Sequence, residues 1–146
     1  MKKLIWIFFV TLFVVVGYYF YLQDQGSIQN IVRREYGLSI PNDFPIISSN
    51  EQWAPNGDGD KIVIWTIPEQ YIAKVSSQCA QLNFSDLSRL QSEDFPDNKV
   101  FAFIPLSDLN GFYKKKRESD NINDLSYSIL IIDLQNHRIV YFIEMS

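Results

Sequence analysis

The sequence predicts an α+β protein, in which an N-terminal transmembrane helix is followed by a small domain with helices packed on a mostly antiparallel sheet. Three observations lead to this fold class. Residues 4–22 form an uncharged apolar run, apolar residues recur at helical spacing within residues 68–82, and strand-like segments gather in the C-terminal third. Helices that precede a group of strands are typical of α+β domains, in which the helices cover one face of the sheet.

The apolar run at residues 4–22 has the length and composition of a membrane anchor. Its 19 residues carry no charge, and Thr11 is their plainly polar member. A helix of that length spans roughly 28 Å, close to the hydrocarbon thickness of a bilayer. Aromatic rings stand near both ends, as in the aromatic belts of membrane interfaces: Trp6 at one end, and Tyr18, Tyr19 and Tyr21 at the other.

The charges that flank the apolar run predict its orientation. Lys2 and Lys3 precede it, and the next basic residue is Arg33. By the positive-inside rule, residues 1–3 are cytoplasmic and residues 23–146 form an extracytoplasmic globular domain. A bacterial inner membrane with the domain facing the periplasm is the favoured setting. A cleaved signal peptide is the rival interpretation, but the run is long and no small-residue cleavage site follows it.

Two helices are expected in the domain. Ser27 suits the N-cap of a short amphipathic helix over residues 27–36, and Gly37 is its C-terminal stop. The second helix is expected over residues 68–82, with Pro68 in its first turn. Residues 85–91 are expected to add a helical turn or two.

The strands are expected mainly towards the C-terminus. Residues 39–49, which contain Pro41 and Pro45, are predicted to be extended or looping, and a strand rich in β-branched residues follows at 61–67. The remaining predicted strands lie at 100–105, 111–116, 125–133 and 138–145. The last two form a hairpin whose side chains are apolar on both faces, which is typical of strands buried on two sides.

The turn-forming string at residues 56–60 resembles the beginning of a calcium loop. Asn56, Asp58 and Asp60 occupy its first, third and fifth positions. An EF-hand then requires glycine sixth and glutamate twelfth, where this chain has Lys61 and Ile67. We therefore expect a tight turn that leads into a strand, and no metal site.

One basic run stands in the acidic domain, and it is formed by Lys114, Lys115, Lys116 and Arg117. It is a candidate surface for an acidic protein partner. The alternative is a solvated strand end that Glu118 and Asp120 partly neutralise.

Composition excludes several functions. Residues 23–146 contain 17 acidic and 11 basic residues, a net charge of −6, which argues against nucleic-acid binding. Cys79 is the single cysteine and lies on the apolar side of its predicted helix, whereas His137, the single histidine, lies in a predicted turn. A Ser-His-Asp triad, a multi-histidine metal site and a disulfide are therefore not expected. No cofactor motif is present, so no cofactor is expected.

These observations favour a membrane-anchored binding or interaction module on the extracytoplasmic side, for example an envelope accessory or inhibitor protein. The bilayer contacts residues 4–22, and the sequence does not identify the protein partner. The alternative is a carboxylate-dependent hydrolase acting on envelope polymers, which requires two acids at a defined separation in a cleft.

Overall fold

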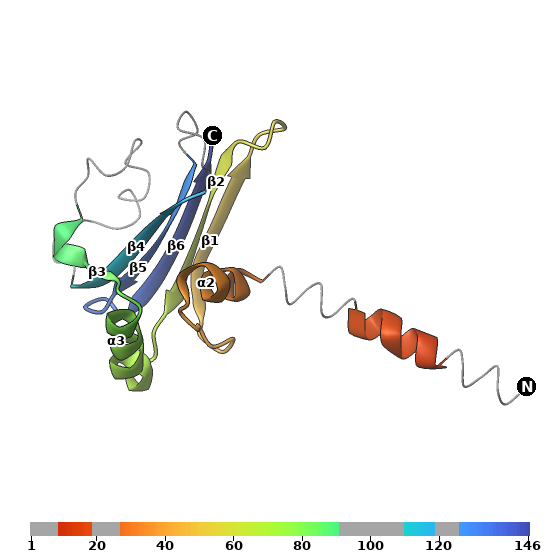
Figure 1. Cartoon of the computed structure of the whole chain (residues 1–146), viewed down its shortest axis with the longest axis horizontal. Coiled ribbons are helices and arrows are strands. Elements are labelled where there is room, and N and C mark those ends of the chain that lie inside the picture. The colour runs from red at the N-terminus through yellow and green to blue at the C-terminus, as the bar shows by residue number, and fades with distance from the viewer. Residues whose placement is uncertain (1–8, 19–26, 91–109, 119–125) are drawn as a thin grey trace, which may run out of the picture. The chain divides into compact units, whose positions relative to one another are not determined.

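The computed structural model describes residues 9–18, 27–90, 110–118 and 126–146. The chain divides into two compact units, residues 1–40 and residues 41–146 (Figure 1). In the first unit, residues 9–18 are helical. Among the residues that the structure describes, no helix combines the length and hydrophobicity needed to cross a membrane. The predicted anchor extends on both sides into residues outside the described ranges, so it stays a prediction.

The first unit also contains α2 (Ile28–Tyr36), which has the caps that its sequence predicts. The Ser27 side chain accepts a hydrogen bond from the Asn30 N–H at 3.3 Å. Gly37 adopts a left-handed conformation, with φ at 78°, and its N–H donates to Arg33 O. Glycine carries no Cβ penalty in that conformation, so it ends the helix cleanly.

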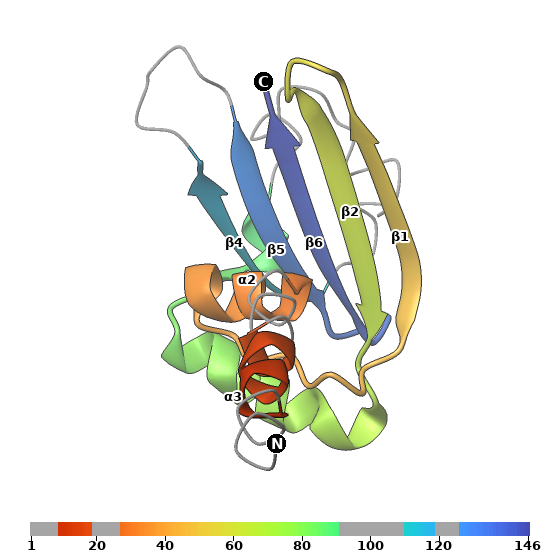
Figure 2. The same ribbon diagram turned by 90° about the vertical axis from the view of Figure 1, so that its right-hand side faces the viewer.

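The second unit is built on a six-stranded sheet with the strand order β1-β2-β6-β5-β4-β3, in which each pair of neighbours is antiparallel. Figure 2 shows the sheet from β1 to β4, and Figure 1 labels β3. Its strands are β1 (Ile46–Trp53), β2 (Gly59–Thr66), β3 (Ser85–Asp86), β4 (Gly111–Arg117), β5 (Tyr127–Asp133) and β6 (Arg138–Met145). Between β2 and β3 lies α3 (Ile72–Gln81), which is preceded by the 3-10 turn η1 (Glu69–Tyr71); η2 (Leu87–Arg89) follows β3. The α+β class is confirmed.

The sheet has two apolar faces, because successive side chains on a strand alternate. We call the first the Phe142 face; it holds a core cluster with Leu87 and Leu90 from and beside η2. The strand residues of that cluster are Ile62, Ile64, Tyr127, Ile129, Ile131, Val140 and Phe142. The other side, the Trp65 face, carries buried side chains at the alternate positions: Val63, Trp65, Leu130, Ile132, Ile139 and Tyr141.

The central position predicted for the C-terminal hairpin is confirmed. Strands β5 and β6 are the two middle strands of the sheet, and all seven residues of β5 are buried. Its turn is organised by the fully buried carboxylate of Asp133, which forms an ion pair with Arg138 Nε at 2.8 Å. The same carboxylate accepts hydrogen bonds from the backbone and side-chain nitrogens of Asn136.

Several predicted boundaries need correction. The strand at 61–67 begins earlier, at Gly59, and the helix predicted from Pro68 begins as η1 before α3 starts at Ile72. Residues 85–91 contain a short strand as well as a 3-10 turn. The strand predicted at 100–105 lies outside the described residues.

The main miss is β1, whose residues were expected to be extended or looping up to 49 and were not assigned beyond it. Its sequence, IISSNEQW, lacks the alternation of apolar and polar residues that marks a half-buried strand. The strand is defined by its pairing with β2, over the register from Ile46–Trp65 to Trp53–Gly59.

Candidate functional site

The outer edge of β1 is the surface of the domain most suited to contact another polypeptide. β1 is a terminal strand of the sheet (Figure 2), and all eight of its residues are exposed. Three of them are large and apolar: Ile46, Ile47 and Trp53 have exposed fractions of 57%, 61% and 43%. A long exposed edge offers a row of backbone donors and acceptors to an added strand.

The hydrogen bonds of the β1–β2 hairpin show which backbone groups point outward. The Ala54 N–H donates to Asp58 O at 2.7 Å, towards β2. Since these groups alternate along an antiparallel strand, the N–H and C=O of Asn50 and Gln52 also point towards β2, and those of Ser49, Glu51 and Trp53 point outward. In agreement, the Glu51 N–H donates to the side chain Oδ1 of Asn50 at 2.9 Å. The outward N–H at the centre of the edge is thus satisfied within β1 itself.

Trp53 is held in place although its indole is exposed. Its Nε1–H donates to Glu51 Oε1 at 2.5 Å, and Glu51 Oε2 forms an ion pair with Lys61 Nζ at 2.7 Å. The hydrogen bond from Lys61, followed by that from Trp53, holds the pKa of the Glu51 carboxyl below its ordinary value. An exposed aromatic side chain with a fixed orientation is a common anchor of protein interfaces.

Gly59 lies opposite Trp53 in the hairpin and completes this arrangement. A Cβ at position 59 would come within 2.7 Å of Trp53 Cε3 and within 2.1 Å of Gln52 O. The indole therefore covers the glycine, and no other residue fits there without displacing the strand.

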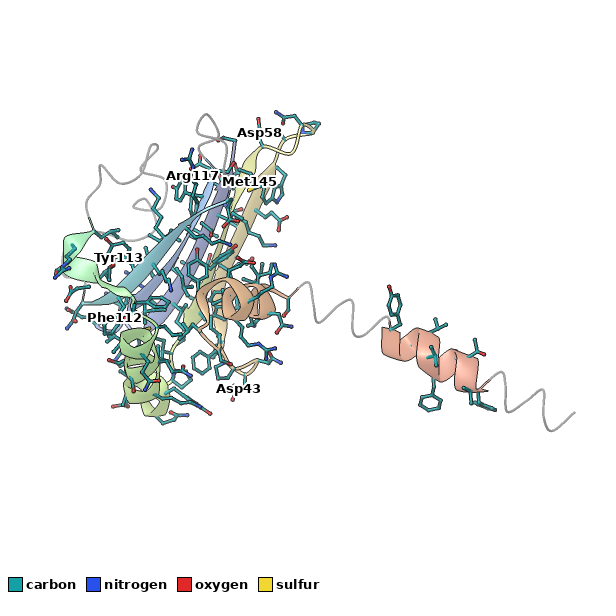
Figure 3. The ribbon with its side chains drawn as sticks, in the orientation of Figure 1. Asp43, Asp58, Phe112, Tyr113, Arg117 and Met145 are labelled. Carbon is teal, nitrogen blue, oxygen red and sulfur yellow. The ribbon has the colours of Figure 1, made fainter. Side chains whose placement is uncertain are left out.

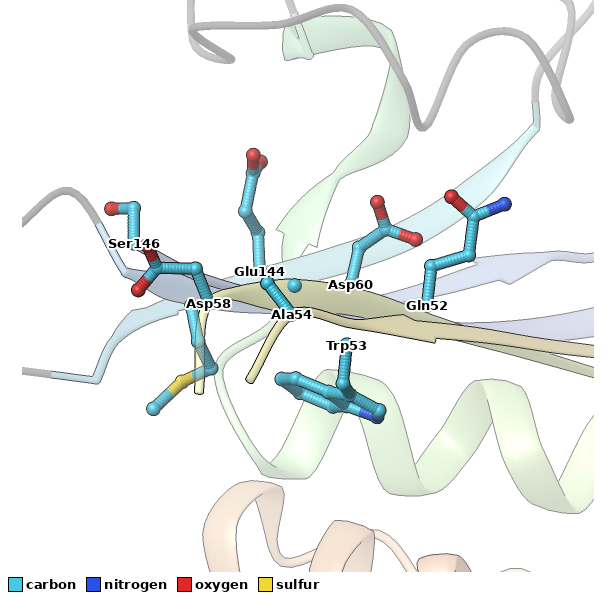
Figure 4. A pocket seen from close by; sticks show the side chains of 9 residues that line it. Gln52, Trp53, Ala54, Asp58, Asp60, Glu144 and Ser146 are labelled. Atoms are coloured by element: carbon cyan, nitrogen blue, oxygen red, sulfur yellow. The ribbon is translucent and has the colours of Figure 1, made fainter. Parts of the chain in front are cut away.

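An open hollow of about 490 Å³ lies at the same end of β1 (Figure 4). Its lining comes from β1, the following turn, β2 and β6, and consists of Gln52, Trp53, Ala54, Asp58, Gly59, Asp60, Glu144, Met145 and Ser146. Asp60 and Glu144 are direct neighbours on adjacent strands and share one face of the sheet. They line one wall together and do not face each other across a cleft, as the two carboxylates of a glycosidase do.

The predicted basic run lies on β4 and is divided between the two faces of the sheet. Lys114 and Lys116 belong to the Trp65 face, whereas Lys115 and Arg117 belong to the Phe142 face; Figure 3 labels Arg117 near the end of the strand. Lys114 Nζ donates to Leu82 O at 3.2 Å, and Lys115 Nζ lies 4.7 Å from the centre of the Tyr127 ring. The run does not form one continuous basic patch.

The other residues considered from the sequence are in structural positions. The turn at residues 54–58 is closed by hydrogen bonds, and within the described ranges no group of three His, Cys, Asp or Glu side chains is arranged to hold a metal ion. Cys79 is fully buried in α3, and desolvation raises the pKa of its thiol to about 12, so the thiolate needed by a nucleophile is suppressed. His137 lies in the β5–β6 turn with a positive φ of 51°.

The predicted topology residues lie mostly outside the described part of the chain. This applies to Lys2, Lys3, Trp6, Tyr19 and Tyr21. Tyr18 is within the described helical residues, and its side chain is exposed.

Sequence reasoning did not identify Ile46, Ile47 and Trp53 as surface residues. One signal was present. Pro45 and Pro55 enclose residues 46–54, and prolines commonly stand at the ends of edge strands, where no ladder N–H is required.

Comparison with protein-family models, with curated proteins and with solved structures gives no match for this chain.

Proposed function

We propose that this protein is a membrane-held binding module on the extracytoplasmic side, and that its β1 edge takes up an extended segment of a protein as an additional strand. In this mode of recognition, backbone hydrogen bonds provide affinity and the flanking side chains provide specificity. The observation that carries the proposal is the fully exposed eight-residue strand at the edge of the sheet.

The side chains of β1 support this mode of binding. Both ends of the strand bear exposed apolar residues, whereas its middle residues, Ser48 to Gln52, are polar. An added strand would thus gain apolar contacts at its ends. The orientation of Trp53 is already fixed by Glu51, so little side-chain entropy is lost when a partner covers it.

The membrane part of the proposal rests on the apolar run at residues 4–22 and on Lys2 and Lys3 before it. Within the run, residues 9–18 are helical and expose large apolar side chains such as Phe13 and Val14. Exposed apolar helices are stable when lipid surrounds them. Compartment-specific reporters fused after Ser146 test the orientation, and a reporter active only in the cytoplasm would contradict it.

Photo-cross-linking in the native membrane tests the binding edge. A benzoylphenylalanine at position 52, beside the outward backbone groups, should give a discrete protein adduct on irradiation. A second change, Ser49→Pro, removes an outward N–H without removing a bond to β2, so it should abolish the adduct. The same probe at Lys74, an exposed residue of α3, is the matched control. An adduct at position 52 that persists with Ser49→Pro would refute strand addition at β1.

The hydrolase alternative has less support. It requires two acids placed on opposite sides of a substrate, and the acids that the described residues bring together, Asp60 and Glu144, stand side by side.

A further inference from the structure

We infer that the strand taken up by β1 is β1 of a second copy of this chain, in an antiparallel pair whose two-fold axis passes through Asn50. This inference rests on the proposed function of the β1 edge and identifies its partner. The pairing would join two six-stranded sheets into one continuous sheet.

Two-fold symmetry restricts the possible registers. An axis perpendicular to the sheet keeps each side chain on its own face, so the central residue of β1 must lie opposite its own copy. The outward backbone groups belong to Ser49, Glu51 and Trp53, and these must meet outward groups of the partner strand. A centre at Asn50 satisfies this condition, because it pairs Ser49 with the partner's Glu51 and Glu51 with the partner's Ser49.

Charge and proline positions favour this centre over its neighbours. A centre at Glu51 would set two carboxylates directly opposite each other, which is destabilising. A centre at Ser49 would place Trp53 opposite Pro45, which has no N–H to donate. A centre at Asn50 places Pro45 opposite the partner's Pro55, just beyond the paired residues. The two prolines are equally distant from Asn50, so the strand between them is used in full.

The side chains of β1 are complementary to themselves in this register. At each end of the pair, Trp53 comes next to the partner's exposed Ile46 and Ile47, where the register of β1 is shifted, so exposed apolar groups meet there. Ser48 meets Gln52, and Ser49 meets Glu51, so polar residues face polar residues. The register shift between Ile46 and Ser48 lies at the end of the strand and leaves the central residues 48–52 regular.

Charge does not oppose the contact at its centre, although the domain is acidic. The one charged side chain of β1, Glu51, is neutralised by Lys61 on β2 at 2.7 Å. On pairing, Asn50 Oδ1 must release the Glu51 N–H, which then donates to the carbonyl of the partner's Ser49. Asn50 therefore satisfies the Glu51 N–H as long as no added strand accepts its hydrogen bond.

Cysteine cross-linking of the full chain in detergent micelles tests the register. Under oxidation, Asn50→Cys should give a disulfide-linked dimer, because the two residues form a non-hydrogen-bonded pair with Cα atoms about 4.5 Å apart, within disulfide range. Gln52→Cys, on the same face and also exposed, should not give one. The double variant Ser48→Cys with Gln52→Cys should form dimers again. Because Cys79 is buried, the unmodified chain should give no disulfide-linked dimer and serves as the control.

Light scattering and amide exchange on the same samples separate the outcomes. We expect the unmodified chain to have the mass of two chains and the Ser49→Pro variant that of one. Self-pairing would be overturned if the unmodified chain were a monomer and Asn50→Cys gave no disulfide-linked dimer. If the β1 amides were nevertheless protected in the native membrane, the proposed function would still stand. A monomer whose β1 amides stay unprotected there would overturn both.

Discussion

The two edges of the sheet are built differently. At one edge, β1 offers eight exposed residues, of which Glu51 is the charged one. At the other, β3 pairs with Phe112 and Tyr113 of β4, and the basic run 114–117 follows on the same strand (Figure 3). Short edge strands and lysines are common devices that prevent unwanted strand pairing. Among the residues that the structure describes, the domain therefore protects the β3–β4 edge and leaves the β1 edge open, which is why we propose a binding role for the open edge.

The centre of the sheet supports both edges, and its loss should have the largest effect. Deleting residues 138–146 removes β6 and its buried Ile139, Val140, Tyr141 and Phe142. Each such side chain contributes roughly 1.5–3 kcal/mol, against about 5–15 kcal/mol for a whole domain. We expect the truncated chain to show no cooperative thermal transition by circular dichroism. A transition near the full-length temperature would show that the hairpin is peripheral.

Proline at neighbouring positions of β1 should separate its inward and outward sides. Asn50→Pro removes an N–H directed at β2 and leaves its carbonyl partner unpaired, and we expect it to lower the free energy of unfolding by about 1–3 kcal/mol. Ser49→Pro removes an outward N–H and no bond to β2, and we expect a smaller loss. Urea unfolding measures both values. Equal losses would contradict the assignment of outward groups.

At the protected β3–β4 edge, we expect a change at Lys115 to have a smaller effect on stability. Lys115→Gln removes the cation that lies over the Tyr127 ring, and we expect a loss of about 0.5–1 kcal/mol in urea unfolding. Lys74→Gln, at an exposed position of α3, should change stability by less than about 0.5 kcal/mol. If the two variants were equally stable, the contact between Lys115 and the Tyr127 ring would contribute nothing to stability.

The smallest effect concerns pH at the open edge. Because hydrogen bonds from Lys61 and Trp53 lower the pKa of Glu51 in the folded chain, its contribution is present above the unfolded pKa and is lost as pH falls through the folded value. We expect the Trp53 indole N–H resonance to shift in NMR spectra only below the ordinary carboxyl range. Trp65, whose indole is buried, is the internal control. Glu51→Gln should abolish the titration.

The sequence predicts those elements whose local signals agree with their tertiary environment. The caps Ser27 and Gly37 define α2, and the two apolar faces of residues 125–133 and 138–145 indicate the middle of a sheet. β1 carries no such pattern, because neither of its faces is buried, and its existence depends on pairing with a distant register of β2.

The candidate site was hidden for a related reason. A tryptophan in a single sequence is expected to be mostly buried. Trp53 instead lies on the exposed edge strand, where it covers Gly59 on the neighbouring strand, and the sequence does not show that these two residues are paired. The burial of Asp133 was equally hidden, since its partners Asn136 and Arg138 meet it only when the β5–β6 turn closes.

Amide hydrogen exchange along β1, followed residue by residue by NMR, tests the open edge most directly. In the Ser49→Pro chain, which cannot accept a full strand, we expect Asn50 and Gln52 to exchange slowly and Glu51 and Trp53 to exchange rapidly. In the unmodified chain in its native membrane, Glu51 and Trp53 should become as protected as their neighbours. If Glu51 and Trp53 exchange rapidly in both samples, no strand is added at β1, and the proposed binding role of this edge is wrong.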